Sequence, residues 1–145
     1  MEILEKDTII LNRYQIVDSI SSGGQAFCFL ATDLQCPASR PWEKDVFVKQ
    51  YHDLPATPEV LNRINGMVNL IQQRLADDSQ YICLPFEIGI THNSIVLVFP
   101  FVRGTSLKDW FAQGDLTTEL RLRFAIALAR SVHCLHRRVC QPLQP

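Results

Sequence analysis

Two adjacent glycines between two strand-like segments constrain the fold of this chain more than any other feature. The two segments cover residues 14–17 and 27–33, and Gly23 and Gly24 lie in the turn between them. A third strand-like segment, 46–49, follows and ends in Lys49. Because three strands come in succession before any helix, the pattern predicts an antiparallel sheet and argues against a parallel α/β sheet.

The rest of the chain predicts an α+β fold, in which a five-stranded antiparallel sheet with one packed helix is followed by two more helices. Residues 81–89 and 94–99 are rich in β-branched and aromatic side chains and predict the last two strands. Thr57, Pro58 and Glu59 are typical of a helix start. The apolar residues that follow lie on one helical face, and they are Val60, Ile64, Met67, Val68, Ile71 and Leu75.

Composition and charge narrow the class of protein. The 145 residues, 47% of them hydrophobic, suffice for one modest core. The net charge of −1 predicts no nucleic-acid partner, and no apolar stretch is long enough to cross a membrane. The five cysteines are odd in number and form no C-x-x-C pair, and the acidic start has no apolar signal region. We therefore expect reduced thiols in a cytoplasmic protein.

The glycine turn and the lysine together point to phosphate chemistry. A backbone that lies close over phosphate groups needs glycine, because a side chain blocks the approach. A lysine on a nearby buried strand can neutralise the same phosphates. Taken alone, Gly23 and Gly24 are explained equally well by a plain β-hairpin turn, and Lys49 by an exposed strand end. No G-x-x-x-x-G-K-[ST] motif is present, so a P-loop NTPase is not predicted.

Later segments extend this pattern into a resemblance to a known family. Residues 100–110 resemble the hinge of a protein kinase and the helix after it, and Leu135-His136 resembles the Leu-His pair before the kinase catalytic loop. In order, the segments resemble the N-terminal lobe of a bacterial Ser/Thr kinase domain plus the first helices of the C-terminal lobe. The resemblance implies a kinase-like ATP-binding region over residues 1–102, and a hinge exit with a truncated C-lobe start over 103–145.

The resemblance also implies an ATP site. Lys49 would contact the α- and β-phosphates under a lid of glycine-turn backbone. Phe99 would be the gatekeeper, and the Pro100 carbonyl and the Val102 N–H would bind adenine. The other implied residues are Gly23, Gly24, Ser21 and Ala26 in the turn, and Ile20, Cys28 and Phe47 as apolar walls. The walls could equally be ordinary core.

Several parts of a kinase site are missing from the sequence. The family places a glutamate partner for the lysine in the middle of the next helix. The only acid in that region is Glu59, whose first-turn position is typical of a helix-dipole charge. The catalytic-loop aspartate and the metal-binding D-F-G aspartate have no counterpart. We expect no catalytic residue, no bound magnesium and at most weak ATP binding.

Two features near the end of the chain suggest other roles. His133, His136 and Cys140 have metal-ligand spacing, but His136 belongs to the Leu-His pair and a fourth ligand is missing, so no metal site is expected. The helix predicted over 117–138 is apolar around much of its circumference, which predicts self-association or a protein partner.

Three functional interpretations stay open at this point. The chain could be the N-terminal part of a protein kinase whose activity needs further sequence. It could be a degenerate, pseudokinase-type module that binds nucleotide or a protein partner without catalysis. It could also be a gene fragment with no independent function.

Overall fold

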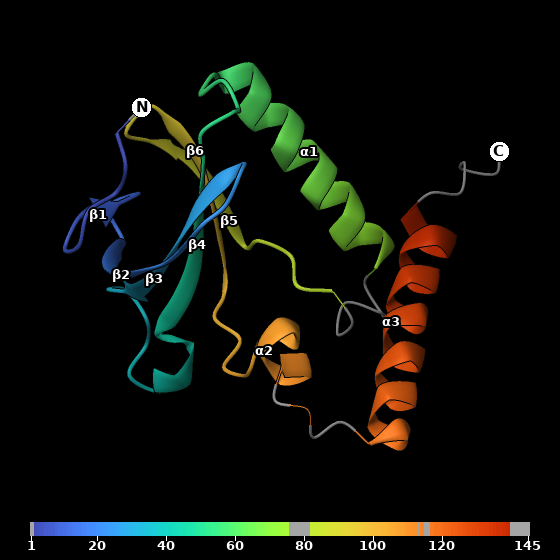
Figure 1. Cartoon of the computed structure of the whole chain (residues 1–145). Helices are drawn as coiled ribbons and strands as arrows, with labels where there is room; N and C mark the ends of the chain where they lie inside the picture. Colours follow the sequence, from blue (N-terminus) through green and yellow to red (C-terminus); the bar gives the residue numbers. More distant parts are fainter. Residues whose placement is uncertain (1, 76–81, 113, 115–116, 140–145) are drawn as a thin grey trace, which may run out of the picture. The chain divides into compact units, whose positions relative to one another are not determined.

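The computed structural model describes residues 2–75, 82–112, 114 and 117–139 (Figure 1). It shows an α+β fold with a six-stranded antiparallel sheet and three α-helices among these residues. The elements are, in order, β1 (Ile9–Ile10), β2 (Tyr14–Ser22), β3 (Ala26–Asp33), the 3-10 helix η1 (Pro41–Glu43), β4 (Asp45–Tyr51), α1 (Pro58–Arg74), β5 (Glu87–Thr91), β6 (Ser94–Pro100), α2 (Leu107–Ala112) and α3 (Thr118–Val139).

All neighbouring strands of the sheet are antiparallel, in the order β1-β2-β3-β4-β6-β5. The predicted antiparallel α+β class is therefore confirmed. The predicted number of five strands was one too low, because β1 has only two residues and is too short to show alternation. Helix α1 stands between β4 and β5 in the chain, and the strand that pairs with β4 after this helix is β6, which leaves β5 at the edge of the sheet.

One face of the sheet forms the main hydrophobic core. Its buried members are Leu4, Ile10, Tyr14, Ile16, Phe29, Ala31, Val46, Val48, Val96 and Val98. Strand alternation explains the members that lie in strands, since every second residue of a strand projects to the same face, and Leu4 joins them from the segment before β1. Gly89 in β5 permits a close approach to the β1–β2 turn, because a Cβ there would lie 2.5 Å from the Leu11 Cδ2 atom.

A buried glutamine ties the N-terminal segment to this core. The Gln50 side chain of β4 is fully buried. Its Nε2 donates to the Glu2 carbonyl (2.7 Å) and to the Ser94 hydroxyl (3.1 Å), and its Oε1 accepts from the Leu4 N–H (3.2 Å). A polar side chain in a core is tolerated when its hydrogen bonds are made in this way.

Two elements differ from their predicted form. The strand predicted over 81–89 begins at Glu87 and runs on to Thr91, since Pro85 has no N–H for a strand ladder; residue 81 lies outside the described residues. In α1 the predicted apolar face holds at Val68, which is buried, but Met67 is 56% exposed.

The chain forms two compact units. One comprises Met1–Asn69 and Cys83–Phe101 and contains the whole sheet, and the other comprises Leu70–Ile82 and Val102–Pro145. Within the second unit, the rings of Trp110 and Phe111 each lie 6.4 Å from the ring of Phe124, which joins α2 to α3. No helix of the described residues is long and apolar enough to span a membrane.

Candidate functional site

Strand β4 presents its predicted site residues on the face opposite the core. Val46, Val48 and Gln50 are buried, whereas Phe47 and Lys49 are half-buried and alternate with them. The register places Cys28 of β3 and Leu97 of β6 directly opposite Lys49. Phe99 is opposite Phe47 in the same way. Because residues directly opposite in a ladder share a face, Cys28, Phe47, Lys49 and Phe99 come together on one side of the sheet.

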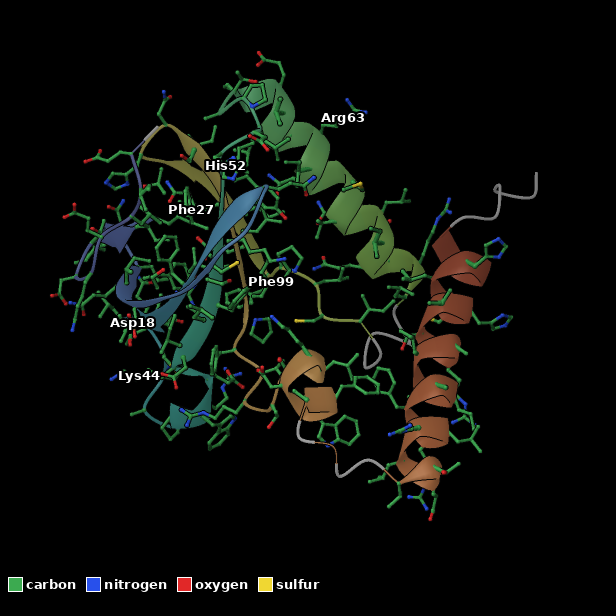
Figure 2. The ribbon with its side chains drawn as sticks, viewed as in Figure 1. Asp18, Phe27, Lys44, His52, Arg63 and Phe99 are labelled. Carbon is green, nitrogen blue, oxygen red and sulfur yellow. The ribbon has the colours of Figure 1, made fainter. Side chains whose placement is uncertain are left out.

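The Lys49 ammonium lies beside two aromatic rings. Its Nζ is 6.0 Å from the centroid of Phe47 and 5.8 Å from that of Phe99. The two rings meet edge to face with their centroids 6.2 Å apart, and Figure 2 labels Phe99 within the sheet. Ring faces attract a cation at such distances. No carboxylate of the described residues forms an ion pair with Lys49, so its charge is free to meet an anion.

The glycine turn closes the β2–β3 hairpin. The Gly23 N–H donates to the Ala26 carbonyl at 3.0 Å. Neither Gly23 nor Gly24 has a left-handed φ. A Cβ on Gly24 would meet open space, and one on Gly23 would lie 3.5 Å from the Ala26 carbonyl oxygen. Type I′ and II′ hairpin turns favour glycine because they require a positive φ. Neither glycine has such a φ here, so the geometry of the hairpin does not explain why glycine is present at both positions.

Other residues of the predicted site are scattered more widely. Ile20 lies at a register irregularity between Ser19 and Ser21 of β2 and is 48% exposed. Ser21 pairs with Cys28, so it joins the Lys49 face. Pro100 is exposed at the end of β6. Val102 belongs to the second compact unit and is 74% exposed.

Glu59 takes the helix-end role that its position predicts. It stands in the first turn of α1. Hydrogen bonds from its own backbone N–H, and then from the Thr57 hydroxyl, lower its pKa. The Thr57 hydroxyl also accepts from the Val60 N–H at 3.4 Å, as an N-cap does. Among the described residues Glu59 therefore does not pair with Lys49.

Sequence reasoning missed an ionic network at the other end of the sheet. Arg13 donates from Nε and Nη2 to both carboxylate oxygens of Asp33, at 2.8 and 2.7 Å, and its Nη1 lies 3.5 Å from Glu87. The Tyr14 hydroxyl also donates to Glu87. These hydrogen bonds lower the pKa of Asp33 and raise that of Arg13, whereas burial comes first among the causes that raise the pKa of Tyr14. No sequence motif predicts this network, because Arg13, Asp33 and Glu87 are far apart in the sequence.

A cavity of about 580 Å³ lies next to this network in the first unit. Asp33, the exposed Trp42 ring and Pro100 contribute to its wall. Of the predicted site residues only Pro100 lines it. Arg13 pairs with Asp33, and Arg40 pairs with Glu43 at 3.2 Å. Both arginines of the wall are therefore already paired with carboxylates, and Asp45 adds a third acidic side chain to the lining.

His52 is a second residue that sequence reasoning missed. It follows β4 directly, and its backbone N–H donates to the Gln25 carbonyl at 3.3 Å. Its Nε2 lies 3.4 Å from the Gly23 carbonyl oxygen and its Nδ1 lies 2.7 Å from Asp53 Oδ1. The ring is 5.4 Å from that of Phe27, and Figure 2 labels both residues. His52, which lies outside the β2–β3 hairpin, therefore contacts the glycine turn through the Gln25 and Gly23 carbonyls.

The comparisons with known proteins leave the site to be judged on its own geometry. Within the described residues no group of three or more His, Cys, Asp or Glu side chains could hold a metal ion, and Cys140 lies outside them. No protein-family model matches the chain, and no curated protein matches it.

Proposed function

We propose that this chain is the nucleotide-binding region of a protein-kinase-like domain and binds an adenine nucleotide weakly, on the sheet face that carries Lys49. The proposal rests on the surroundings of Lys49. Lys49 is a half-buried residue whose ammonium lies beside Phe47 and Phe99, and it forms no ion pair with any carboxylate of the described residues. A cation held in this way is suited to an anionic ligand such as a polyphosphate.

The glycine turn supports the same ligand. Ala26 pairs with Tyr51, two residues beyond Lys49 on β4, so the turn begins roughly 7 Å along the strand from the lysine. The Gly24 N–H makes no hydrogen bond within the described part of the chain. Since the fold itself does not require glycine at this turn, close approach of a ligand to the backbone is the remaining physical reason for it.

The order of elements supports the kinase-like interpretation. A hairpin with a glycine turn, a strand with a lysine, a helix and two more strands follow one another as they do in a kinase N-terminal lobe. The helix glutamate that orients the lysine in that family has no counterpart in α1. The proposal therefore covers nucleotide binding and excludes phosphoryl transfer by this chain alone.

Calorimetry on matched lysine variants tests the proposal. Wild-type protein should bind ATP weakly, and magnesium should not change the affinity. Lys49→Met should lower ATP affinity about tenfold or more, since hydrogen bonds to charged groups contribute about 1.5–3 kcal/mol, and should leave adenosine affinity unchanged. Lys44, which precedes β4 and is exposed, supplies the control (Figure 2); Lys44→Met should change neither affinity.

Three results would count against the proposal. Wild-type protein that binds neither ATP nor adenosine has no such site. An equal loss of ATP affinity in Lys49→Met and Lys44→Met would mean non-specific attraction by surface charge. A large gain in affinity with magnesium would contradict the metal-independent binding expected here.

A protein-binding role is the second candidate, and helix α3 favours it. Leu122, Leu128 and Val132 are all exposed on this helix. Large apolar side chains gathered on one exposed element are typical of an interaction surface. This role does not exclude nucleotide binding, because α3 and the sheet belong to different compact units.

A further inference from the structure

The imidazole of His52 lies between two hydrogen-bond acceptors. One ring nitrogen faces the Asp53 carboxylate and the other faces the Gly23 carbonyl. A neutral imidazole has one N–H and one lone pair, so it can donate to only one of the two acceptors. An imidazolium has two N–H groups and can donate to both. The geometry is therefore complete only when His52 is protonated.

The surroundings of His52 favour the charged ring. The hydrogen bond with Asp53, and then that with the Gly23 carbonyl, raise its pKa above the ordinary value. Asp53 is the charged group that faces the ring, and the groups that the hairpin contributes, the Gly23 and Gln25 carbonyls and the Phe27 ring, do not titrate. The side chain is 21% exposed, so it exchanges protons with solvent.

We propose that His52 is a positioning residue for the glycine turn, which it holds in place when protonated and releases when neutral. The contact acts on the carbonyl of Gly23, whose own N–H is fixed by Ala26. The Gly24 N–H then keeps one orientation toward a phosphate group. The ligand in this inference rests on the proposed function, whereas the coupling between His52 and the turn does not.

NMR spectroscopy of the full chain without ligand tests the coupling. In wild-type protein the amide resonances of Gly23 and Gly24 should shift between about pH 5 and pH 8.5, with the same midpoint as the His52 ring. His52→Phe keeps an aromatic ring against Phe27 and should abolish the shift. His92→Phe is the control, since His92 is exposed in the β5–β6 turn, and should retain it.

The wild-type spectrum alone can overturn the coupling, even if a variant fails to fold. Glycine amides that do not move with the His52 midpoint would refute it. So would a shift that persists in a folded His52→Phe protein. His52→Gln, which carries no titrating group, should behave as His52→Phe does.

Nucleotide titrations test the positioning role. At about pH 5.5 wild-type protein should bind ATP about fivefold more tightly than His52→Phe, the factor that one hydrogen bond of about 1 kcal/mol gives. At about pH 8.5 the two affinities should be equal, because the ring is then neutral. At each pH the ionisation of ATP is the same for the two proteins, so it does not affect the comparison. Adenosine should bind wild-type protein and His52→Phe equally well at either pH.

The two measurements separate this inference from the proposed function. Coupled glycine amides without any ATP binding would refute the nucleotide site and leave the His52 contact standing. An affinity ratio that is the same at both pH values would refute the positioning role, even if ATP binds.

Discussion

At the scale of single residues, a substitution of Gln50 by an apolar residue of similar size should lower the free energy of unfolding. Gln50→Leu is of similar size but leaves the Leu4 N–H and the Glu2 carbonyl without the partner described above, whereas the Ser94 hydroxyl still donates to the His92 carbonyl. Buried groups left unsatisfied in this way cost about 1–3 kcal/mol. Urea unfolding should show this loss of stability. Gln73→Leu, at an exposed position of α1, is the control and should change stability little; equal stability of both variants with wild type would contradict the prediction.

The ion pair of Arg13 and Asp33 should make stability depend on pH. Hydrogen bonds from Arg13 hold the pKa of Asp33 below its ordinary value, and the carboxylate is 7% exposed. A lowered folded-state pKa stabilises the fold above the unfolded-state value of about 3.9, and the contribution is lost as the pH falls below that value toward the folded-state pKa.

The variant Asp33→Asn tests this dependence. It should lose about 1–3 kcal/mol at neutral pH, as removal of a charged hydrogen-bond partner does. Its deficit against wild type should shrink as the pH falls below about 3.9. Urea unfolding at a series of pH values measures both quantities. Asp18→Asn, at an exposed site of β2 (Figure 2), should show a smaller deficit; a deficit for Asp33→Asn that stays constant with pH would refute the linkage.

These residue-level features could not be read from the sequence. Strand alternation places Gln50 on the same face as Val48, where a polar side chain contradicts the pattern. Its partners Glu2 and Ser94 are more than 40 positions away. Lys49 differs, because its strand and the upstream glycine turn are local features and were both predicted, although β4 runs two residues beyond Lys49, to Tyr51. Its chemical role is still a proposal.

At the scale of elements, a substitution in the glycine turn should weaken nucleotide binding without lowering the stability of the fold. Gly24→Ala adds a methyl group in open space, so it should leave stability unchanged or raise it by about 0.4–1 kcal/mol. It should nevertheless weaken ATP binding, because the side chain obstructs close approach of phosphate to the backbone. Thermal unfolding and calorimetry on the same sample measure the two effects.

Gly89→Ala is the opposite case and serves as the control. Its Cβ would lie 2.5 Å from the Leu11 Cδ2 atom, at the end of a flexible side chain, so Leu11 must shift and the variant should lose about 1 kcal/mol of stability. A folded Gly89→Ala protein should bind ATP normally. If Gly24→Ala binds ATP as tightly as wild type does, the turn is not a phosphate lid.

The types of the secondary-structure elements were predicted well, whereas the residues at which they begin and end were predicted less well. The apolar runs of β3, β4 and β6, rich in β-branched and aromatic residues, and the 3.6-residue period of α1 are local signals. The start of β5 was wrong because Ile82, Cys83 and Phe86 have strand-forming side chains, whereas the ladder with β6 begins only at Glu87. Backbone pairing is decided by distant residues, which a local pattern does not contain.

At the scale of the whole molecule, helix α3 carries several large apolar side chains that are exposed. Leu122 is 61% exposed, and Leu120, Ile126, Leu128 and Val132 are exposed as well. At about 100° per residue, Leu122 and Ile126 lie on one side of the helix and Leu128 and Val132 on another. The helix therefore offers more than one apolar stripe to a partner.

The full chain should self-associate through α3. Burial of a large apolar side chain contributes about 1.5–3 kcal/mol, so a few such residues suffice for a measurable dimer. Light scattering should show a mass above 16.6 kDa that decreases on dilution. The double variant Leu122→Glu, Leu128→Glu should be monomeric with unchanged helicity by circular dichroism. Arg130→Glu changes the net charge by the same amount, −2, and adds its carboxylate on the side of the helix that carries Glu119 and Arg123, so it should associate as wild type does. A wild-type chain that stays monomeric at high concentration, or a double variant that associates as strongly as Arg130→Glu, would show that α3 does not drive self-association.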